Sequence, residues 1–432
     1  MKIIKKVCKV FLFIATFLLL LIAVADAAWI YVPQLTAQRK IDNLENAARD
    51  IVDITVPDGA AVIALGEASH GNVEFQQLKL SVLQQLVAQG VRAFALEADF
   101  GEGLLVNRFI HGEGDCATVE DVIEHLSFTI YHTQQMADLF QWMRDYNAGV
   151  SEEEQLSFYG FDLQNPRAGL DFLLSFCEEE NVLPELDKSS VQSYIDGTYS
   201  LADEQAKSAL ECLGVIKNHL TDHESEYLTR SDDVLFAVRM IDCVENFLVC
   251  LDNGGVANYI YYNDTRDGYM AENVLWVLEY LKTQGCDRLM ISGHNGHVGC
   301  RQQFYTPMGA HLREKLGSRY FAIGTDYYHT TCNINAAGAD TTRGDYRFCS
   351  ADPFAANAKK LGKSYYLSFA EALENGGETA ELLQSEIYMG SLGEGYSWTM
   401  HIFPMSHRIK AVPITLYDGM IFVYDATPIS VF

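Results

Sequence analysis

The chain has 432 residues, of which 49% are hydrophobic and 12% aromatic, so it can build a core and is neither a disordered nor a low-complexity protein. Its 58 acidic and 31 basic residues give a formal net charge of −27 at pH 7. Each phosphate contact needs a cation to replace its counterions, so a chain this acidic is expected to repel nucleic acids and anionic lipid headgroups. We exclude nucleic-acid binding as its main function.

Residues 1–32 have the pattern of an export segment. Lysines precede an apolar run from Val10 to Ala25, which ends in the small-residue sequence Ala25-Asp26-Ala27. The aromatic residues from Trp29 to Tyr31 are typical of a membrane interface. We expect a signal peptide or an N-terminal membrane anchor. We favour the anchor, because Asp26 is unfavourable in a cleavage site. The lysines lie before the run, so either alternative exports the remaining chain, anchored in the cell membrane or secreted.

Five short apolar segments that run directly into polar residues are predicted to be strands. They are residues 61–65, 91–96, 156–161, 288–292 and 320–324. Residues 74–88 between the first two have helical periodicity. Alternating strands and helices predict an α/β fold with a mostly parallel central sheet and flanking helices, and we expect residues 40–432 to form this domain.

The pattern changes to helices from about residue 167 to 284. Apolar stripes at helical spacing run through 206–220 and 270–281, and residues 235–251 are apolar nearly all round. We interpret the segment as a helical insertion that covers the C-terminal ends of the strands. After it, residues 400–403, 414–417 and 420–424 are predicted to be closing strands.

The polar residues at the predicted strand ends form the candidate active site. Ligands bind outside the carboxyl ends of parallel strands, so side chains there are expected to share a cleft. They are Glu67, His70, Glu97, Asp162, His294 and His297. Imidazoles beside carboxylates suit general-base activation of water. The same residue types suit a metal site, so both chemistries stay open.

Other catalytic chemistries lack their motifs. No serine lies in a G-x-S-x-G nucleophile elbow, and no glycine-rich loop with Lys-Ser/Thr indicates phosphate binding. Nine of the ten cysteines follow the leader residue Cys8, and none form a C-x-x-C pair. The sequence therefore does not support a serine hydrolase, a P-loop enzyme, a zinc ribbon or a disulfide scaffold.

The joint order of the motifs resembles the erythromycin esterase family from about residue 60 to 330. The motifs that carry the resemblance are Ala64-Leu-Gly-Glu-Ala-Ser-His-Gly71 with Glu74-Phe75, Ala95-Leu-Glu-Ala98, Phe158-Tyr-Gly-Phe-Asp162, Arg266-Asp267 with Met270-Ala-Glu-Asn273, Gly293-His-Asn-Gly-His297 and Tyr424-Asp425-Ala426. The resemblance implies an erythromycin-esterase-like α/β domain with a helical portion. It also implies macrolide-antibiotic inactivation, in which water opens the lactone directly without an acyl-enzyme.

The family's pattern also implies roles for individual residues. It places the essential base on His70 and the other catalytic groups on Glu67, Glu97, His294 and His297. We assign Lys79, Asp162 and Arg266 to substrate binding. Lys79 departs from the pattern, because the family often has arginine there and lysine does not make the same bidentate contacts.

Three functions follow from these observations. The first is a carboxylic ester or lactone hydrolase that needs no cofactor, acts on a small molecule and has no inferred protein partner. The second is a hydrolase in which the same His/Glu cluster holds a divalent metal. The third is a non-catalytic exported binding protein. The complete set of three histidines and two glutamates favours an enzyme over the third function.

Overall fold

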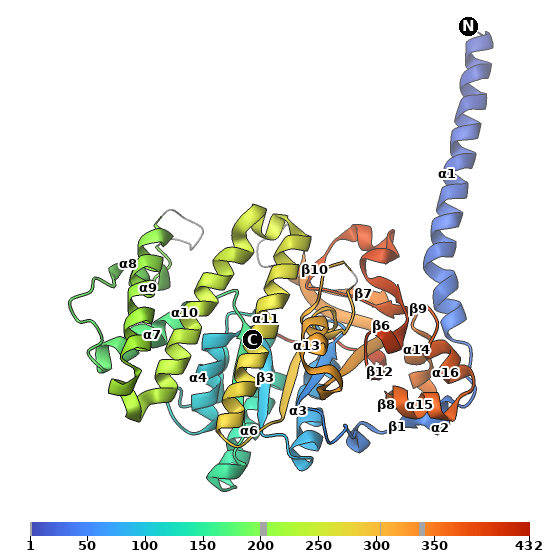
Figure 1. The fold of residues 1–432 in the computed structure, drawn as a ribbon. Helices are drawn as coiled ribbons and strands as arrows, with labels where there is room; N and C mark the ends of the chain where they lie inside the picture. The colour runs from blue at the N-terminus through green and yellow to red at the C-terminus, as the bar shows by residue number, and fades with distance from the viewer. Residues whose placement is uncertain (1, 199–204, 303, 337–341) are drawn as a thin grey trace.

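The computed structural model describes residues 2–198, 205–302, 304–336 and 342–432. Among these residues the central sheet has ten strands, eight of them in the order β1-β8-β12-β6-β2-β5-β3-β4, while β7 and β10 pair with β6 (Figure 1). The sheet is mixed and mostly parallel, with helices packed around it. The predicted α/β fold class is confirmed.

The five strands predicted before residue 330 are adjacent in this sheet, with β4 at its edge, and they run parallel to one another. They are β2 (Val62–Glu67), β3 (Ala93–Asp99), β4 (Ser157–Asp162), β5 (Leu289–His294) and β6 (Tyr320–Ala336). β12 (Gly419–Ala426) extends the parallel run beside β6. The antiparallel strands are β1 (Ala48–Arg49), β7 (Arg343–Cys349) and β8 (Ser364–Ser368).

Two of the three predicted closing strands are wrong. Residues 400–403 and 414–417 lie in or beside the 3₁₀ turns Trp398–His401, Pro404–Ser406 and Pro413–Thr415, whereas residues 420–424 lie in β12. Pro404 and Pro413 supply no backbone N–H for a ladder hydrogen bond, which explains why these apolar stretches turn. The remaining strands are β10 (Gly395–Tyr396), which pairs with β6, and β9 (Ile387–Gly390) with β11 (Arg408–Ala411), which form a separate pair.

Both faces of the sheet are covered, because successive side chains of a central strand enter different cores. Val62 and Ala64 of β2 lie in one hydrophobic cluster, and Ile63 and Leu65 lie in another. The helices before residue 160 are α2 (Leu44–Ala47), α3 (Val73–Ala88), α4 (Phe100–Ile110), α5 (Val119–Glu124) and α6 (Gln134–Ala148).

Residues 167–284 contain the helices α7 (Arg167–Glu179), α8 (Ser189–Ile195), α9 (Ala206–Asp222), α10 (Ser231–Leu251) and α11 (Tyr259–Thr283). α7 to α10 enclose a hydrophobic cluster of their own, which includes Leu173 and Ile216. α11 also packs on β4, and its buried side chains reach the candidate site. The later helices are α12 (Asn295–Val298), α13 (Met308–Leu316), α14 (Pro353–Asn357), α15 (Phe369–Asn375) and α16 (Gly377–Leu383).

Helix α1 (Lys2–Ala37) projects from the body as one continuous helix (Figure 1). By length and composition, its part from Lys9 to Ala37 is able to cross a membrane, a test that signal sequences also pass. Its last turns are hydrogen-bonded to the body. The Arg408 guanidinium donates to the Ile30 carbonyl at 3.1 Å, and the Tyr328 hydroxyl donates to the Gln34 carbonyl at 2.7 Å.

Candidate active site

The parallel register places the ends of β2 and β5 side by side. Glu67 at the end of β2 pairs with His294 at the end of β5. His70 lies in the turn that leads from β2 into α3, and its ring centroid is 5.1 Å from that of His294. Residues more than 200 positions apart therefore meet at one edge of the sheet, as expected for a parallel arrangement.

His70 is held by a buried carboxylate. Its Nδ1 lies 2.8 Å from Glu67 Oε1, and the other oxygen of Glu67 accepts a hydrogen bond from the Lys79 ammonium. Burial opposes charge on Glu67, but the charge of Lys79 and the hydrogen bond from His70 outweigh it and lower the pKa of Glu67 to about 2. His70 Nε2 has no hydrogen-bond partner among the described residues, and the side chain is 12% exposed.

The same carboxylate changes the proton affinity of His70. Burial alone lowers the pKa of the imidazole, but the hydrogen bond and charge of Glu67, assisted by Glu97 and Glu394, outweigh burial and raise the pKa to about 9. The resting ring is therefore an imidazolium at neutral pH. Its proton on Nδ1 faces Glu67, so Nε2 is the atom available for exchange with a reacting group.

Glu97 joins the two histidines that follow β5. Its Oε2 accepts from the His294 backbone N–H at 2.7 Å, and its Oε1 accepts from the Arg266 guanidinium at 3.0 Å. Arg266 also holds Asp162 in a bidentate pair, with N···O distances of 2.9 and 2.6 Å. Burial raises the pKa of Glu97, but the charges of His297 and Arg266 outweigh it and hold that pKa well below its ordinary value. Glu97 is ionised at neutral pH.

His297 is held by Asp267, which is not among the predicted site residues. Both carboxylate oxygens of Asp267 lie 2.9 Å from His297 Nδ1, and one of them also accepts from the Met308 backbone N–H at 2.8 Å. His297 Nε2 lies 3.3 Å from Glu97 Oε1. Burial lowers the pKa of His297, but the charges of Asp267 and Glu97 outweigh burial and raise it.

His294 differs from the other two histidines because it is neutral. Its Nε2 is 3.1 Å from the Leu392 carbonyl and its Nδ1 accepts from the Gly296 N–H at 3.1 Å, which assigns the proton to Nε2. Burial and the neighbouring charges of His70 and His297 lower its pKa to about 4. The cluster therefore combines His294, whose pKa is lowered, with His70 and His297, whose pKa values are raised.

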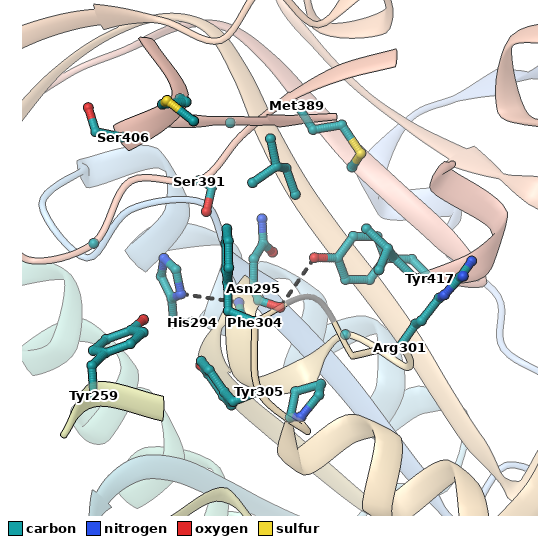
Figure 2. A pocket seen from close by; sticks show the side chains of 18 residues that line it. Tyr259, His294, Asn295, Arg301, Phe304, Tyr305, Met389, Ser391, Ser406 and Tyr417 are labelled. Carbon is teal, nitrogen blue, oxygen red and sulfur yellow. Dashed lines mark hydrogen bonds between the residues drawn. The ribbon is translucent and has the colours of Figure 1, made fainter. Parts of the chain in front are cut away.

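A pocket of about 260 Å³ opens beside His294. The segment after β5 lines one side and the β9–β11 region lines the other; labelled in Figure 2 are His294, Phe304, Tyr305, Met389, Ser391 and Ser406. Tyr417 and Asn295 also line the pocket, and the Tyr417 hydroxyl donates to the Asn295 carbonyl at 3.2 Å. His294 is the catalytic candidate that lines this pocket, and its contact with the His70 ring connects the pocket to the base.

The glycines around the first motif serve packing. A Cβ atom at Gly66 would lie 2.2 Å from Asn295 Oδ1, and one at Gly71 would lie 2.4 Å from the Asn333 carbonyl oxygen. Gly293 is constrained in the same way, because a Cβ there would lie 2.7 Å from Glu97 Oε2. These glycines let the site's own strands and side chains approach one another, rather than admitting a ligand to the backbone.

The structure brings all eight predicted site residues into one connected cluster. Lys79 and Asp162 are fully buried and bind Glu67 and Arg266, respectively, so here they hold other site residues in place. Their contact with a substrate stays a prediction, as does that of Arg266. Asp267 was missed although it follows Arg266 in sequence; a carboxylate on the buried stripe of α11 was the available signal.

The arrangement of the donor atoms in the cluster bears on the divalent-metal alternative. The described residues contain no group of three or more His, Cys, Asp or Glu side chains arranged to hold a metal. The nitrogen atoms of His294 are engaged by the protein, and Arg266 Nη1 lies 3.2 Å from His297 Nε2, where a guanidinium opposes a cation. The Lys79 ammonium occupies the corresponding place at Glu67.

Residues 87–426, more than half of the chain, match the family model described as erythromycin esterase. The chain belongs to the erythromycin esterase family. The match contains Glu97, Asp162, Arg266, His294 and His297, whereas the motif with Glu67 and His70 lies before it. Family membership supports an esterase-like hydrolase.

Relatives and solved structures agree with this placement in the erythromycin esterase family. Erythromycin esterase type II of Escherichia coli is 26% identical over 299 residues, which cover 62% of this chain and 69% of the relative. A Bacillus cereus protein structure has a TM-score of 0.74 at 19% identity and covers 92% of this chain and 99% of its own. A mutant of erythromycin esterase EreC in its open conformation has a TM-score of 0.58 at 15% identity, covering 88% and 97%. At these identities, the two structures show a shared fold.

Proposed function

We propose that the protein hydrolyses a carboxylic ester or a macrolide lactone, with His70 as the general base that activates water. The observation that carries the proposal is the arrangement of His70: Glu67 holds Nδ1 at 2.8 Å, and Nε2 has no partner among the residues described. An imidazole oriented by a carboxylate at one nitrogen and open at the other is the arrangement that general-base catalysis requires.

The proposed reaction needs only water and the ester. Neutral His70 takes a proton from water at Nε2 while the water oxygen bonds to the carbonyl carbon. The tetrahedral intermediate then expels the alkoxide, which receives the proton back from His70. The products are a carboxylic acid and an alcohol, joined in one molecule when the substrate is a lactone. Glu67 stays ionised and stabilises the imidazolium throughout.

Two further histidines supply the polar surroundings of the carbonyl in this proposal. His294 lines the pocket as a neutral imidazole whose Nε2–H donates to the Leu392 carbonyl. In this proposal the ring rotates away from Leu392, and its Nε2–H then donates to the substrate carbonyl and polarises it. The Arg266 guanidinium places a positive charge 3.0 Å from Glu97 Oε1, and His297 Nε2 lies 3.3 Å from the same oxygen.

We favour a metal-independent reaction over the divalent-metal alternative because Arg266 and Lys79 occupy the positions beside the histidine and glutamate donors. The experiment is to remove divalent ions with a chelator, measure the residual metal content and assay ester turnover. Full activity in metal-depleted protein supports the proposal, and activity that returns only with added Zn²⁺ contradicts it.

The proposed activity is tested with a panel of macrolides, simpler lactones and an aryl ester. We expect a mass gain of one water in at least one lactone, and loss of turnover in the His70→Asn variant. Binding without turnover of any ester would instead support the non-catalytic alternative.

We also propose that α1 anchors the protein in the cell membrane with its body outside the cytoplasm. The lysine-rich start, the apolar span and the hydrogen bonds that join the end of α1 to the body support this placement. Protease added to intact cells tests it: the body is digested while a cytoplasmic control survives. Protection of the body in spheroplasts would contradict it.

A further inference from the structure

The pocket is bordered by an exposed apolar rim. Tyr259, Phe304 and Met405 line the pocket and are 59%, 65% and 69% exposed. Within seven residues of Tyr259 or Met405 in sequence lie further large apolar side chains that are at least half exposed, and we count them with the rim: Val256, Ile260, Trp398 and Phe403. Several large exposed apolar side chains gathered around one pocket are typical of a surface that contacts a partner or a membrane.

The three segments that contribute the rim contain no acidic residue, although the chain as a whole is acidic. The segments 253–263, 295–313 and 395–417, which contribute the rim, contain no Asp or Glu, although the whole chain contains 58. The third segment carries Arg408 and Lys410. Carboxylates border these segments, among them the exposed Asp264, which accepts from the Thr306 backbone N–H at 2.8 Å. The rim side chains themselves carry no negative charge that would oppose contact with a lipid surface.

The structure also ties the rim to the membrane helix through one strand. In β11, Arg408 donates to the Ile30 carbonyl of α1, and the next residue, Ile409, lines the pocket. The helix from Val10 to Trp29 is about 30 Å long, which equals the hydrocarbon thickness of a bilayer. Ile30 and the strand that binds it therefore lie at the level where the helix leaves the bilayer.

The direction of α1 agrees with this placement. In Figure 1, α1 extends past the body on the same side as the turn between α10 and α11 and the segment around β10. The rim residues from Val256 to Ile260 belong to the first of these regions, and Trp398 and Phe403 follow β10 in sequence. The rim and the membrane span thus lie towards one end of the molecule.

We infer that the rim sits in the interface of the bilayer that holds α1, and that the pocket takes its substrate from that interface. The inference rests on the proposed ester hydrolysis and anchoring, and it specifies the substrate class as an amphiphilic ester or lactone that partitions into the membrane. The pocket volume, about 260 Å³, is below the roughly 300–1,000 Å³ typical for drug-sized ligands. The pocket therefore admits the reacting ester group of the substrate, while the apolar remainder of the substrate stays at the rim.

The seating of the rim is tested by tryptophan fluorescence of the full chain in phosphatidylcholine vesicles with brominated acyl chains. The chain has four tryptophans, so the signal of Trp398 is the difference between the unmodified protein and Trp398→Phe. We expect brominated lipid to quench this difference. An unquenched difference overturns the inference, whether or not the protein hydrolyses any ester.

The substrate class is tested with the double variant Trp398→Ser/Phe403→Ser, which leaves the pocket lining unchanged. Its rate on a long-chain ester dissolved in vesicles should fall by about tenfold or more, because two buried aromatic contacts with lipid are lost, whereas its rate on a short water-soluble ester should not change. The matched control is Val52→Ser/Leu228→Ser, which removes equally exposed apolar side chains outside the rim. If the double variant slows both esters equally, the inference is overturned. If the unmodified protein hydrolyses no ester but brominated lipid still quenches Trp398, only the proposed hydrolysis is overturned.

Discussion

The Nδ1 atom of His70 lies 2.8 Å from Oε1 of Glu67, and this contact fixes the ring, its tautomer and its proton affinity together. The pairing spans three residues and joins the end of β2 to the turn before α3. A buried Lys79 keeps Glu67 ionised, so the imidazolium of His70 is stabilised by an anion that cannot readily take its proton. The same arrangement that makes His70 a strong base makes it a protonated one at neutral pH.

Replacing His70 with asparagine should remove most of the activity without unfolding the protein. Asparagine keeps polarity and approximate size but has no basic nitrogen, and general-base catalysis typically contributes 10²–10⁴-fold, so kcat should fall by about that factor. The measurement is ester turnover together with a thermal unfolding curve. The exposed His125→Asn is the control. Activity of His70→Asn within a few-fold of the unmodified enzyme would refute the assignment.

The pH profile should report the deprotonation of His70. A general base acts in its neutral form, so kcat/KM should rise with pH and level off above about 9, the pKa of His70 in the free enzyme. In Glu67→Gln the anion that raises this pKa is gone, so the rising limb should move to lower pH while the maximal rate falls. An unchanged limb in Glu67→Gln would show that another group titrates.

Neither Glu67 nor Glu97 should form a covalent intermediate. Both carboxylates are buried and held by hydrogen bonds to protein cations or backbone, which leaves them as partners of the histidines. In a single turnover in heavy-oxygen water, we expect the label in the carboxylic acid product and none in the protein. Label recovered on either glutamate would establish nucleophilic catalysis instead.

Asp267→Asn should disturb His297 while preserving the fold. Asparagine has similar size but no charge, so the pKa of His297 should fall, and its ring should lose the carboxylate that orients it. We expect kcat to fall by about tenfold or more with a smaller change in KM. An NMR titration of the His297 ring separates positioning from a structural role, because a purely structural role would leave the pKa of His297 unchanged.

Glu102→Gln should stabilise the protein at alkaline pH. Burial raises the pKa of Glu102 to about 7, so the folded state holds a proton that the unfolded chain releases near pH 4.5. Stability therefore falls as pH rises from about 4.5 to 7, and glutamine should recover about 1–3 kcal/mol above pH 7 and little at pH 4. Denaturant unfolding at both pH values measures this difference. The exposed Glu120→Gln is the control, and an equal effect at the two pH values would count against the raised pKa.

The sequence by itself determined the parallel strands of the sheet and eight members of the candidate site. Short apolar segments alternating with helical stripes specify parallel strands, and the carboxyl ends of parallel strands must meet at one edge. Glu67, Glu97 and His294 follow such strands, so their proximity was predictable without coordinates. The apolar stretches 400–403 and 414–417 were misassigned because strand and turn share short apolar runs, and only the prolines distinguish them.

The tertiary structure decided which of these side chains pair and which are charged. Asp267 reaches His297 only because α11 lies beside the turn after β5, a contact between residues thirty positions apart that no local pattern encodes. The rings of His70 and His294 lie 5.1 Å apart at the same edge of the sheet, yet the pKa is about 9 for His70 and about 4 for His294. The reason is physical: proton affinity depends on burial and on distances to charges from distant parts of the chain, and those distances exist only in the folded protein.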